Sequence, residues 1–131
     1  QAEVSDEELP VEEFTHRYTL DLIAENKDFD DELILHWSVA RKSLGEWSKP
    51  DDIMLPLKSI RWSDNLSVQT SFARNPVYPE YRTLRITLEW LASQEASAAV
   101  QAINFVLLEP KKNWWHNNNK ENFQAPLAIR K

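Results

Sequence analysis

The 131-residue sequence predicts an all-β fold in which two antiparallel sheets pack face to face. Three observations support this prediction. Several segments alternate apolar and polar residues with the two-residue period of a half-buried strand, turn residues recur about every ten positions, and only residues 92–100 favour a helix. About six to eight short strands with this spacing are typical of an immunoglobulin-like antiparallel β-sandwich, with a β-barrel as the main alternative.

The first half of the chain predicts a leader and two strands. Residues 1–12 are acidic and read as a leader or linker, whereas residues 13–131 form the folded module. In residues 14–24 the even positions are expected to point inward, and His16 is the one exception to their apolar character. In residues 33–40 the odd positions, Trp37 included, are expected to point inward. A long surface loop is then predicted over residues 41–56, which contain Gly45, two prolines and two adjacent aspartates.

The second half predicts further short strands. Residues 59–62 and 66–72 flank a turn at Asp64 and Asn65, and the prolines of residues 75–80 predict another loop. The clearest strand covers residues 81–90, and a helical turn follows it. The later segments are residues 103–107, whose odd positions are apolar and point inward, a loop after Pro110 that includes Trp114 and Trp115, and a last strand at 123–129.

The composition excludes several classes of function. A single glycine leaves no Gly-rich phosphate loop, and the absence of cysteine leaves no disulfide, thiolate metal site or cysteine nucleophile. The longest apolar run, 102–108, is too short to span a membrane. The net charge is −6, and residues 33–131 hold 13 basic against 9 acidic residues, too dispersed for a nucleic-acid face. We expect no cofactor, no nucleic acid and no membrane among the ligands.

Neither a catalytic nor a metal site is expected. The three histidines, His16, His36 and His116, are far apart in the sequence and lie in no catalytic or metal-binding motif. Adjacent acidic residues, such as Asp30 and Asp31, do not by themselves give the separation that glycoside cleavage needs. The module itself is therefore expected not to be an enzyme, and any catalysis belongs to an attached domain.

The six tryptophans are the most informative residues. Trp37 and Trp90 fall on apolar strand faces and are expected in the core. Trp47 and Trp115 lie in segments without apolar periodicity and are expected at the surface, whereas the pattern does not decide between core and ligand for Trp62 and Trp114. An exposed indole flanked by amide side chains suits a sugar ring, which stacks its C–H face on the indole and bonds its hydroxyls to the amides.

Several strings carry a family resemblance. They are Leu35-His36-Trp37, then Gly45-Glu46-Trp47, Ile103-Asn104-Phe105 and the tail from Asn113 to Phe123. In this order and spacing they resemble the starch-binding modules of carbohydrate-binding module family 45, which occur in α-glucan water dikinases and some plastidial α-amylases. The chain departs from that family at Ser38 and Lys120, where glycine is usual.

The resemblance implies a β-sandwich that binds starch or other α-1,4-glucan chains and targets an attached catalytic domain to them. Maltooligosaccharides and cyclodextrin would be soluble analogues. It implies carbohydrate-binding roles for Trp47, Trp115, Arg41, Asn118 and Asn119, and a location in the plastid stroma at the starch granule, or in the cytosol of lineages that store starch there. The alternative function is a protein-interaction module that uses the exposed tryptophans as anchors.

Overall fold

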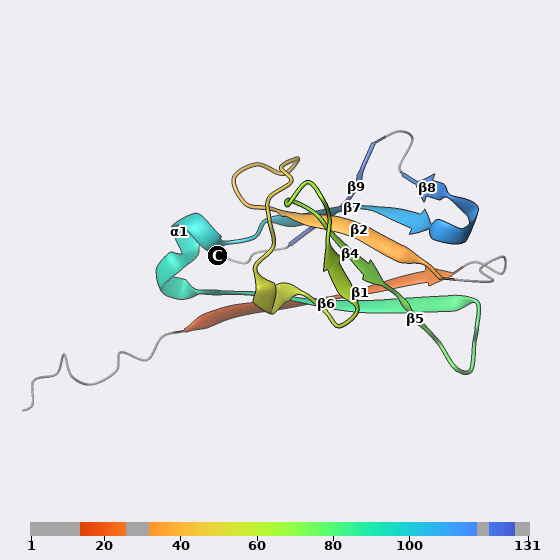
Figure 1. Cartoon of the computed structure of the whole chain (residues 1–131). Helices are drawn as coiled ribbons and strands as arrows, with labels where there is room; N and C mark the ends of the chain where they lie inside the picture. The colour runs from red at the N-terminus through yellow and green to blue at the C-terminus, as the bar shows by residue number, and fades with distance from the viewer. Residues whose placement is uncertain (1–13, 26–31, 118–120, 128–131) are drawn as a thin grey trace, which may run out of the picture.

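A computed structural model describes residues 14–25, 32–117 and 121–127 and shows two packed antiparallel sheets (Figure 1). Three strands form the lower sheet in the figure and six form the upper sheet. The predicted β-sandwich is therefore confirmed, and the two separate sheets exclude the barrel alternative.

The three-stranded sheet is built around one long antiparallel pair. Strand β1 (Thr15–Glu25) pairs along its whole length with β6 (Tyr81–Leu91), and β5 (Ala73–Arg74) adds two residues at the other edge of β6. Along β1 the even positions are half-buried and the odd positions exposed, as predicted. Strand β6 buries its even positions in the same way, so both strands present one face to the core.

The six-stranded sheet has β2 near its centre. Strand β2 (Ile34–Ala40) lies between β4 (Val68–Ser71) and β7 (Ala102–Glu109). Strand β3 (Ser59–Arg61) pairs with β4, while β8 (Trp114–His116) and β9 (Phe123–Pro126) both pair with β7. Because Leu35, Trp37 and Val39 are fully buried toward the other sheet, His36 projects from the opposite face of β2.

The core lies between the sheets and contains both tryptophans expected there. Trp37 is fully buried and Trp90 is 4 % exposed. The indole Nε1 of Trp37 donates a hydrogen bond to Oγ1 of Thr70 at 2.9 Å, which satisfies the one polar atom of this side chain. Trp90 stacks on Tyr18 of β1, with ring centroids 5.3 Å apart. Both indoles belong to the hydrophobic core cluster, to which residues of both sheets contribute.

Among the residues that the structure describes, helical structure is confined to short turns. The predicted helical turn within 92–100 is confirmed as η3 (Ala92–Gln94) followed by α1 (Glu95–Ala98), and the other turns are η2 (Asp52–Met54) and η4 (Pro110–Lys112). In the described part of the chain, none of these helices has the length and hydropathy needed to cross a membrane.

Two predicted boundaries near the C-terminus differ from the structure. Trp114 and Trp115, predicted in a loop, lie in β8, because η4 and the left-handed Asn113 (φ 51°) turn the chain back onto β7. The last strand, predicted to reach residue 129, ends at Pro126, and residues 128–131 are outside the described ranges. Strand β8 was missed because its three residues are too few to show the alternation from which strands are predicted.

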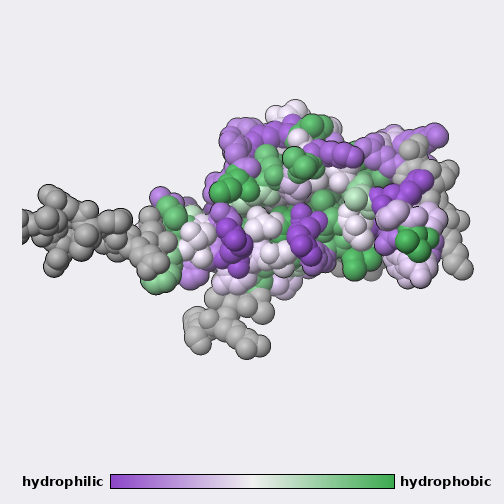
Figure 2. All heavy atoms as spheres, turned by 90° about the horizontal axis from the view of Figure 1, so that it is seen from below, coloured by the Kyte–Doolittle hydropathy of each residue, from purple (hydrophilic) through white to green (hydrophobic). Residues whose placement is uncertain are grey.

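The outer face of the three-stranded sheet carries charged side chains among other residues. Two ion pairs cross it between β1 and β6, Arg17 with Glu89 at 2.9 Å and Asp21 with Arg85 at 2.7 Å. Figure 2 views this face from below and shows hydrophilic residues interspersed with hydrophobic ones. Such a mixture is normal for a surface in water, and it contrasts with the outer face of the six-stranded sheet.

Candidate functional site

Three indoles converge on one imidazole at the outer face of the six-stranded sheet. The ring of His36 lies 5.8 Å from that of Trp47, 5.6 Å from that of Trp62 and 5.4 Å from that of Trp115, measured between centroids. We call these four residues the aromatic cluster. They come from β2, the loop after β2, the turn after β3, and β8, so the fold gathers residues that are up to 79 positions apart. The structure thus brings together Trp47 and Trp115, and it adds Trp62 to them.

His36 is held in place at the centre of the aromatic cluster. The amide Nε2 of Gln69, on the neighbouring strand β4, lies 3.2 Å from Nδ1 of His36. Because an amide nitrogen only donates, Nδ1 accepts this bond and the neutral ring carries its proton on Nε2. Burial lowers the pKa of His36 below its ordinary value, while the Asp64 carboxylate opposes this shift. The cluster is therefore built around a neutral ring at neutral pH.

The indoles of the aromatic cluster do not form a flat surface. The imidazole plane is inclined by 37° to the plane of Trp47 but by 85° and 87° to those of Trp115 and Trp62. The Trp47 plane must therefore be inclined to each of the other two by at least the difference between these angles, about 50°. A ligand that stacks on Trp47 and on either other indole has to bend between them.

The loop that carries Trp47 is fastened to the sheet by amide side chains. Nδ2 of the buried Asn104 donates to the carbonyls of Leu44 and Glu46, at 2.9 Å each. Gln124 of β9 also donates to Leu44, at 2.6 Å, and to Oδ1 of Asn104 at 3.0 Å. These bonds fix the backbone on the N-terminal side of Trp47 and hold its half-buried indole in place.

The side chain of Glu46 bonds to the backbone at the start of the same loop. Its carboxylate accepts hydrogen bonds from the backbone N–H groups of Arg41 and Lys42, at 2.8 and 3.0 Å, and these bonds lower the pKa of Glu46. Gly45 has no atom within 4 Å of the position that a Cβ would occupy, and its φ is not positive. The single glycine is therefore not required by space or by backbone conformation at this point of the loop.

Trp62 lies in the tight hairpin turn between β3 and β4. Its N–H donates to the carbonyl of Ser67 at 2.9 Å, and its carbonyl accepts from Asn65 at 3.0 Å. Asp64 accepts hydrogen bonds from the N–H groups of Leu66 and Ser67, while Asn65 takes the left-handed conformation at φ 58°. The turn is rigid, yet the Trp62 side chain is 40 % exposed.

A buried serine joins the Trp47 loop to the Trp62 turn. The hydroxyl of Ser38, on the outward face of β2, is within hydrogen-bond distance of the carbonyls of Ser48 and Leu66. The first carbonyl follows Trp47 and the second belongs to the turn of Trp62. Ser38 is fully buried, so this contact is closed to water. Its position two residues after His36 places it on the same strand face.

Trp115 reaches the aromatic cluster from the edge strand β8. It lies opposite Leu108 of β7, which lies opposite Ile34, two residues before His36 on the same face of β2. Its side chain is 41 % exposed. Trp114 points to the other face of β8, where it stacks on His116 at 4.5 Å. These neighbouring tryptophans therefore belong to different surfaces.

The other residues predicted for the site are not placed in the aromatic cluster. Nη1 of Arg41 donates to Ser48 Oγ at 2.9 Å and to the Lys49 carbonyl at 2.8 Å, so this guanidinium supports the loop backbone beyond Trp47. Asn118 and Asn119 lie outside the described residues. Direct sugar contacts by all three residues therefore stay predictions.

Sequence reasoning missed four residues that build the site: His36, Ser38, Gln69 and Asn104. Their polar side chains lie on the outward face of the six-stranded sheet. His36, Ser38 and Asn104 each contact an indole or a segment that carries one, and Gln69 bonds to His36. The alternation of β2 does place His36 and Ser38 on that face. The alternation does not show which loops pack over these two residues.

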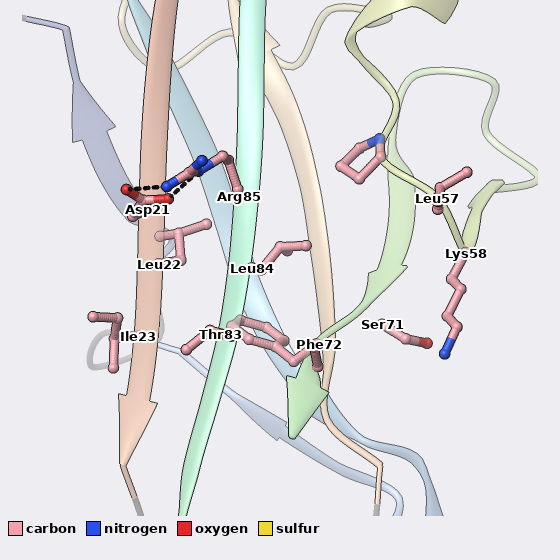
Figure 3. Close-up of a pocket in the computed structure, with 12 residues that line it drawn as sticks. Asp21, Leu22, Ile23, Leu57, Lys58, Ser71, Phe72, Thr83, Leu84 and Arg85 are labelled. Atoms are coloured by element: carbon pink, nitrogen blue, oxygen red, sulfur yellow. Dashed lines mark hydrogen bonds and ion pairs between the residues drawn. The ribbon is translucent and has the colours of Figure 1, made fainter. Parts of the chain in front are cut away.

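A separate cleft of about 720 Å³ opens between the two sheets (Figure 3). Leu22 and Leu84 lie on one side of it and Leu57 on the other, with the Asp21–Arg85 ion pair at the rim. Its lining includes none of Trp47, Trp62 and Trp115. Among the described residues, no group of three His, Cys, Asp or Glu side chains could hold a metal ion.

Comparison with known families agrees with this architecture. The family model described as "Alpha-glucan water dikinase 1 Ig-like N-terminal domain" matches residues 4–127. The searches of curated proteins and of solved structures found no match. The match confirms the immunoglobulin-like fold and the relation to α-glucan water dikinase, whereas membership of carbohydrate-binding module family 45 stays a prediction. Because the match covers nearly the whole chain, this chain belongs to the family of Ig-like N-terminal domains of alpha-glucan water dikinase 1.

Proposed function

We propose that this chain is a non-catalytic module that binds starch through Trp47 and Trp115 and brings an attached enzyme, α-glucan water dikinase, to its substrate. The observation that carries the proposal is the convergence of partly exposed indoles on His36. Exposed indoles are costly in water unless a ligand or partner covers them. The family match supports an attached enzyme that acts on an α-glucan.

The shape of the aromatic cluster favours an α-linked glucan over a β-linked one. An α-1,4-glucan chain curves from one glucose to the next, whereas a β-1,4-glucan chain is straight and packs into flat surfaces. Indole planes inclined by about 50° or more match the curved chain and cannot all lie flat on a planar one. The ligand that we propose is therefore a single bent segment of α-1,4-glucan.

The charges near the aromatic cluster favour a neutral ligand. The Asp64 carboxylate acts on His36, and its own pKa is lowered, so it is ionised at neutral pH. A negative charge at this position would repel the phosphates of a nucleic acid. A sugar has no charge to be repelled, and its hydroxyls can bond to amide and carboxylate groups.

The proposed affinity is modest. We expect a dissociation constant of about 10 µM to 1 mM for this site, to which stacking on each indole contributes ~1–3 kcal/mol by analogy with base stacking. Reversible contact would let an attached enzyme move over a granule, and a second linked module would raise retention. We propose that this happens in the plastid stroma, or in the cytosol where starch is stored there.

Co-sedimentation with granular starch tests the proposal, with microcrystalline cellulose as the comparison. The unmodified chain should sediment with starch and not with cellulose. Trp47→Ala and Trp115→Ala should each weaken retention about fivefold or more, because each removes one stacking surface. Trp114→Ala is the matched control, since Trp114 is equally an exposed indole of β8 but faces away from the cluster.

Two results would contradict the proposal in different ways. Absence of starch binding by the folded, unmodified chain would exclude the function. Undiminished retention of both Trp47→Ala and Trp115→Ala, with unchanged thermal unfolding, would exclude these residues as the binding site.

A further inference from the structure

Trp62 has the same relation to His36 as Trp115 has. Both indoles stand nearly perpendicular to the imidazole, at 87° and 85°, and their centroids lie 5.6 and 5.4 Å from its centroid. Their side chains are 40 % and 41 % exposed. If exposure and placement suit Trp115 for stacking on a sugar, they suit Trp62 equally.

The three indoles are close enough to contact one short ligand. Because each lies less than 6 Å from the same imidazole, no two of their centroids are separated by more than about 12 Å. A few linked glucose units span such a distance. Ser38 also connects the Trp47 loop to the Trp62 turn, so these two indoles are carried on segments that are tied together.

The turn that carries Trp62 is already ordered without a ligand. Its backbone is fixed by the hydrogen bonds of Trp62 with Ser67 and Asn65 and by the Asp64 carboxylate, which accepts from two N–H groups. A rigid residue loses little conformational freedom when it binds, so more of its contact energy appears as affinity. The Trp62 side chain is 40 % exposed, and this apolar surface is available to a ligand.

We propose that Trp62 is a third glucan-contacting residue, so that Trp47, Trp62 and Trp115 form one continuous site around His36. The inference rests on the proposed function, because it concerns the same ligand. It deepens that function by making the ligand a bent α-1,4-glucan segment that all three indoles contact at once.

Fluorine NMR with 5-fluorotryptophan tests this inference with maltoheptaose as the probe. Each of the six tryptophans should give one resonance, which single Trp→Phe variants assign. The resonances of Trp47, Trp62 and Trp115 should move on titration, whereas those of Trp37, Trp90 and Trp114 should stay within experimental error. The first two of these controls are buried, and the third is exposed on another surface.

Affinity measurements complete the test. Trp62→Ala should raise the dissociation constant for maltoheptaose about fivefold or more, and Trp114→Ala should leave it unchanged. Trp62→Phe, which keeps a flat ring, should recover part of the loss. Trp62→Leu keeps apolar bulk beside His36 without a flat ring, and it replaces the alanine variant if that variant does not fold.

The outcomes separate this inference from the proposed function. If maltoheptaose moves the resonances of Trp47 and Trp115 while folded Trp62→Ala or Trp62→Leu binds as tightly as the unmodified chain, the inference is wrong and the function stands. If maltoheptaose moves no resonance and does not bind, the function and the inference fall together.

Discussion

At the scale of single residues, His36 links the sheet to the proposed ligand surface. Its ring touches three indoles on one side of the structure and accepts a hydrogen bond from Gln69 on the sheet itself. A residue in this position must be neutral to keep Nδ1 as an acceptor. Burial supplies that condition by lowering the pKa of His36.

The lowered pKa of His36 predicts a pH-dependent stability. Below pH 6.5, the ordinary value for histidine, the unfolded chain binds a proton at this residue while the folded chain does so only at lower pH. The free energy of unfolding should therefore fall as pH decreases from 6.5 to the lower pKa of the folded state. Urea denaturation at pH 7.5 and 5.5 measures this change.

His36→Gln is the control for this prediction, because glutamine does not titrate. Its free energy of unfolding should decrease less between pH 7.5 and 5.5 than that of the unmodified chain. An equal decrease in the two proteins would show that His36 does not contribute.

Residue positions in strands could be predicted well, and residue positions in turns could not. The two-residue period placed Trp37 and Trp90 in the core, and the structure confirms both. Trp62 stayed undecided because it follows the end of β3 and begins a turn, where the period stops. The turn at Asp64 and Asn65 was predictable, but the contact of Trp62 with His36 of β2 joins residues distant in the sequence, which no local pattern shows.

At the scale of elements, the proposed site depends on two connections that cross the outer face of β2. The loop after β2 carries Trp47, and the β3–β4 turn carries Trp62. Ser38 contacts a backbone carbonyl of each. The carbohydrate-binding family that the sequence resembles usually has glycine at this position, which has no hydroxyl to offer. In this chain a side chain joins two elements that the backbone alone leaves separate.

Ser38→Ala should therefore loosen both connections. The substitution leaves buried carbonyl oxygens without the hydroxyl, and we expect the free energy of unfolding to fall by about 1–2 kcal/mol. Binding of maltoheptaose should weaken as well, because the two indoles lose their common anchor. Urea denaturation and titration calorimetry measure the two effects.

Ser43→Ala is the control for the Ser38→Ala prediction, since Ser43 is an exposed residue of the loop that carries Trp47. It should change the free energy of unfolding by less than about 0.5 kcal/mol. Equal stability and affinity of the Ser38 and Ser43 variants would contradict the role given to Ser38.

Elements with clear alternation were predictable, and short elements fixed by tertiary pairing were not. Strands β1, β2 and β6 appear where the period indicates them. Strand β8 exists because η4 and Asn113 turn the chain back toward β7, and β5 has only two residues. Three and two residues are too few to display a period, so pairing with a distant strand decides their structure.

At the scale of the whole molecule, the two sheets present unlike outer faces. The three-stranded sheet carries ion pairs such as Asp21 with Arg85, whereas the six-stranded sheet carries the aromatic cluster. The sandwich class follows from strand spacing alone. The cluster does not, because it requires β2 to lie near the centre of its sheet with connections from both sides folded over it.

The central claim is that the aromatic cluster binds α-1,4-glucan, and titration calorimetry with maltoheptaose tests it most directly. The unmodified chain should bind with a dissociation constant of about 10 µM to 1 mM. The double variant Trp47→Ala, Trp115→Ala should show no measurable binding at the same concentrations, whereas Trp114→Ala should bind like the unmodified chain. Equal binding by the double variant, with its fold intact, would contradict the claim.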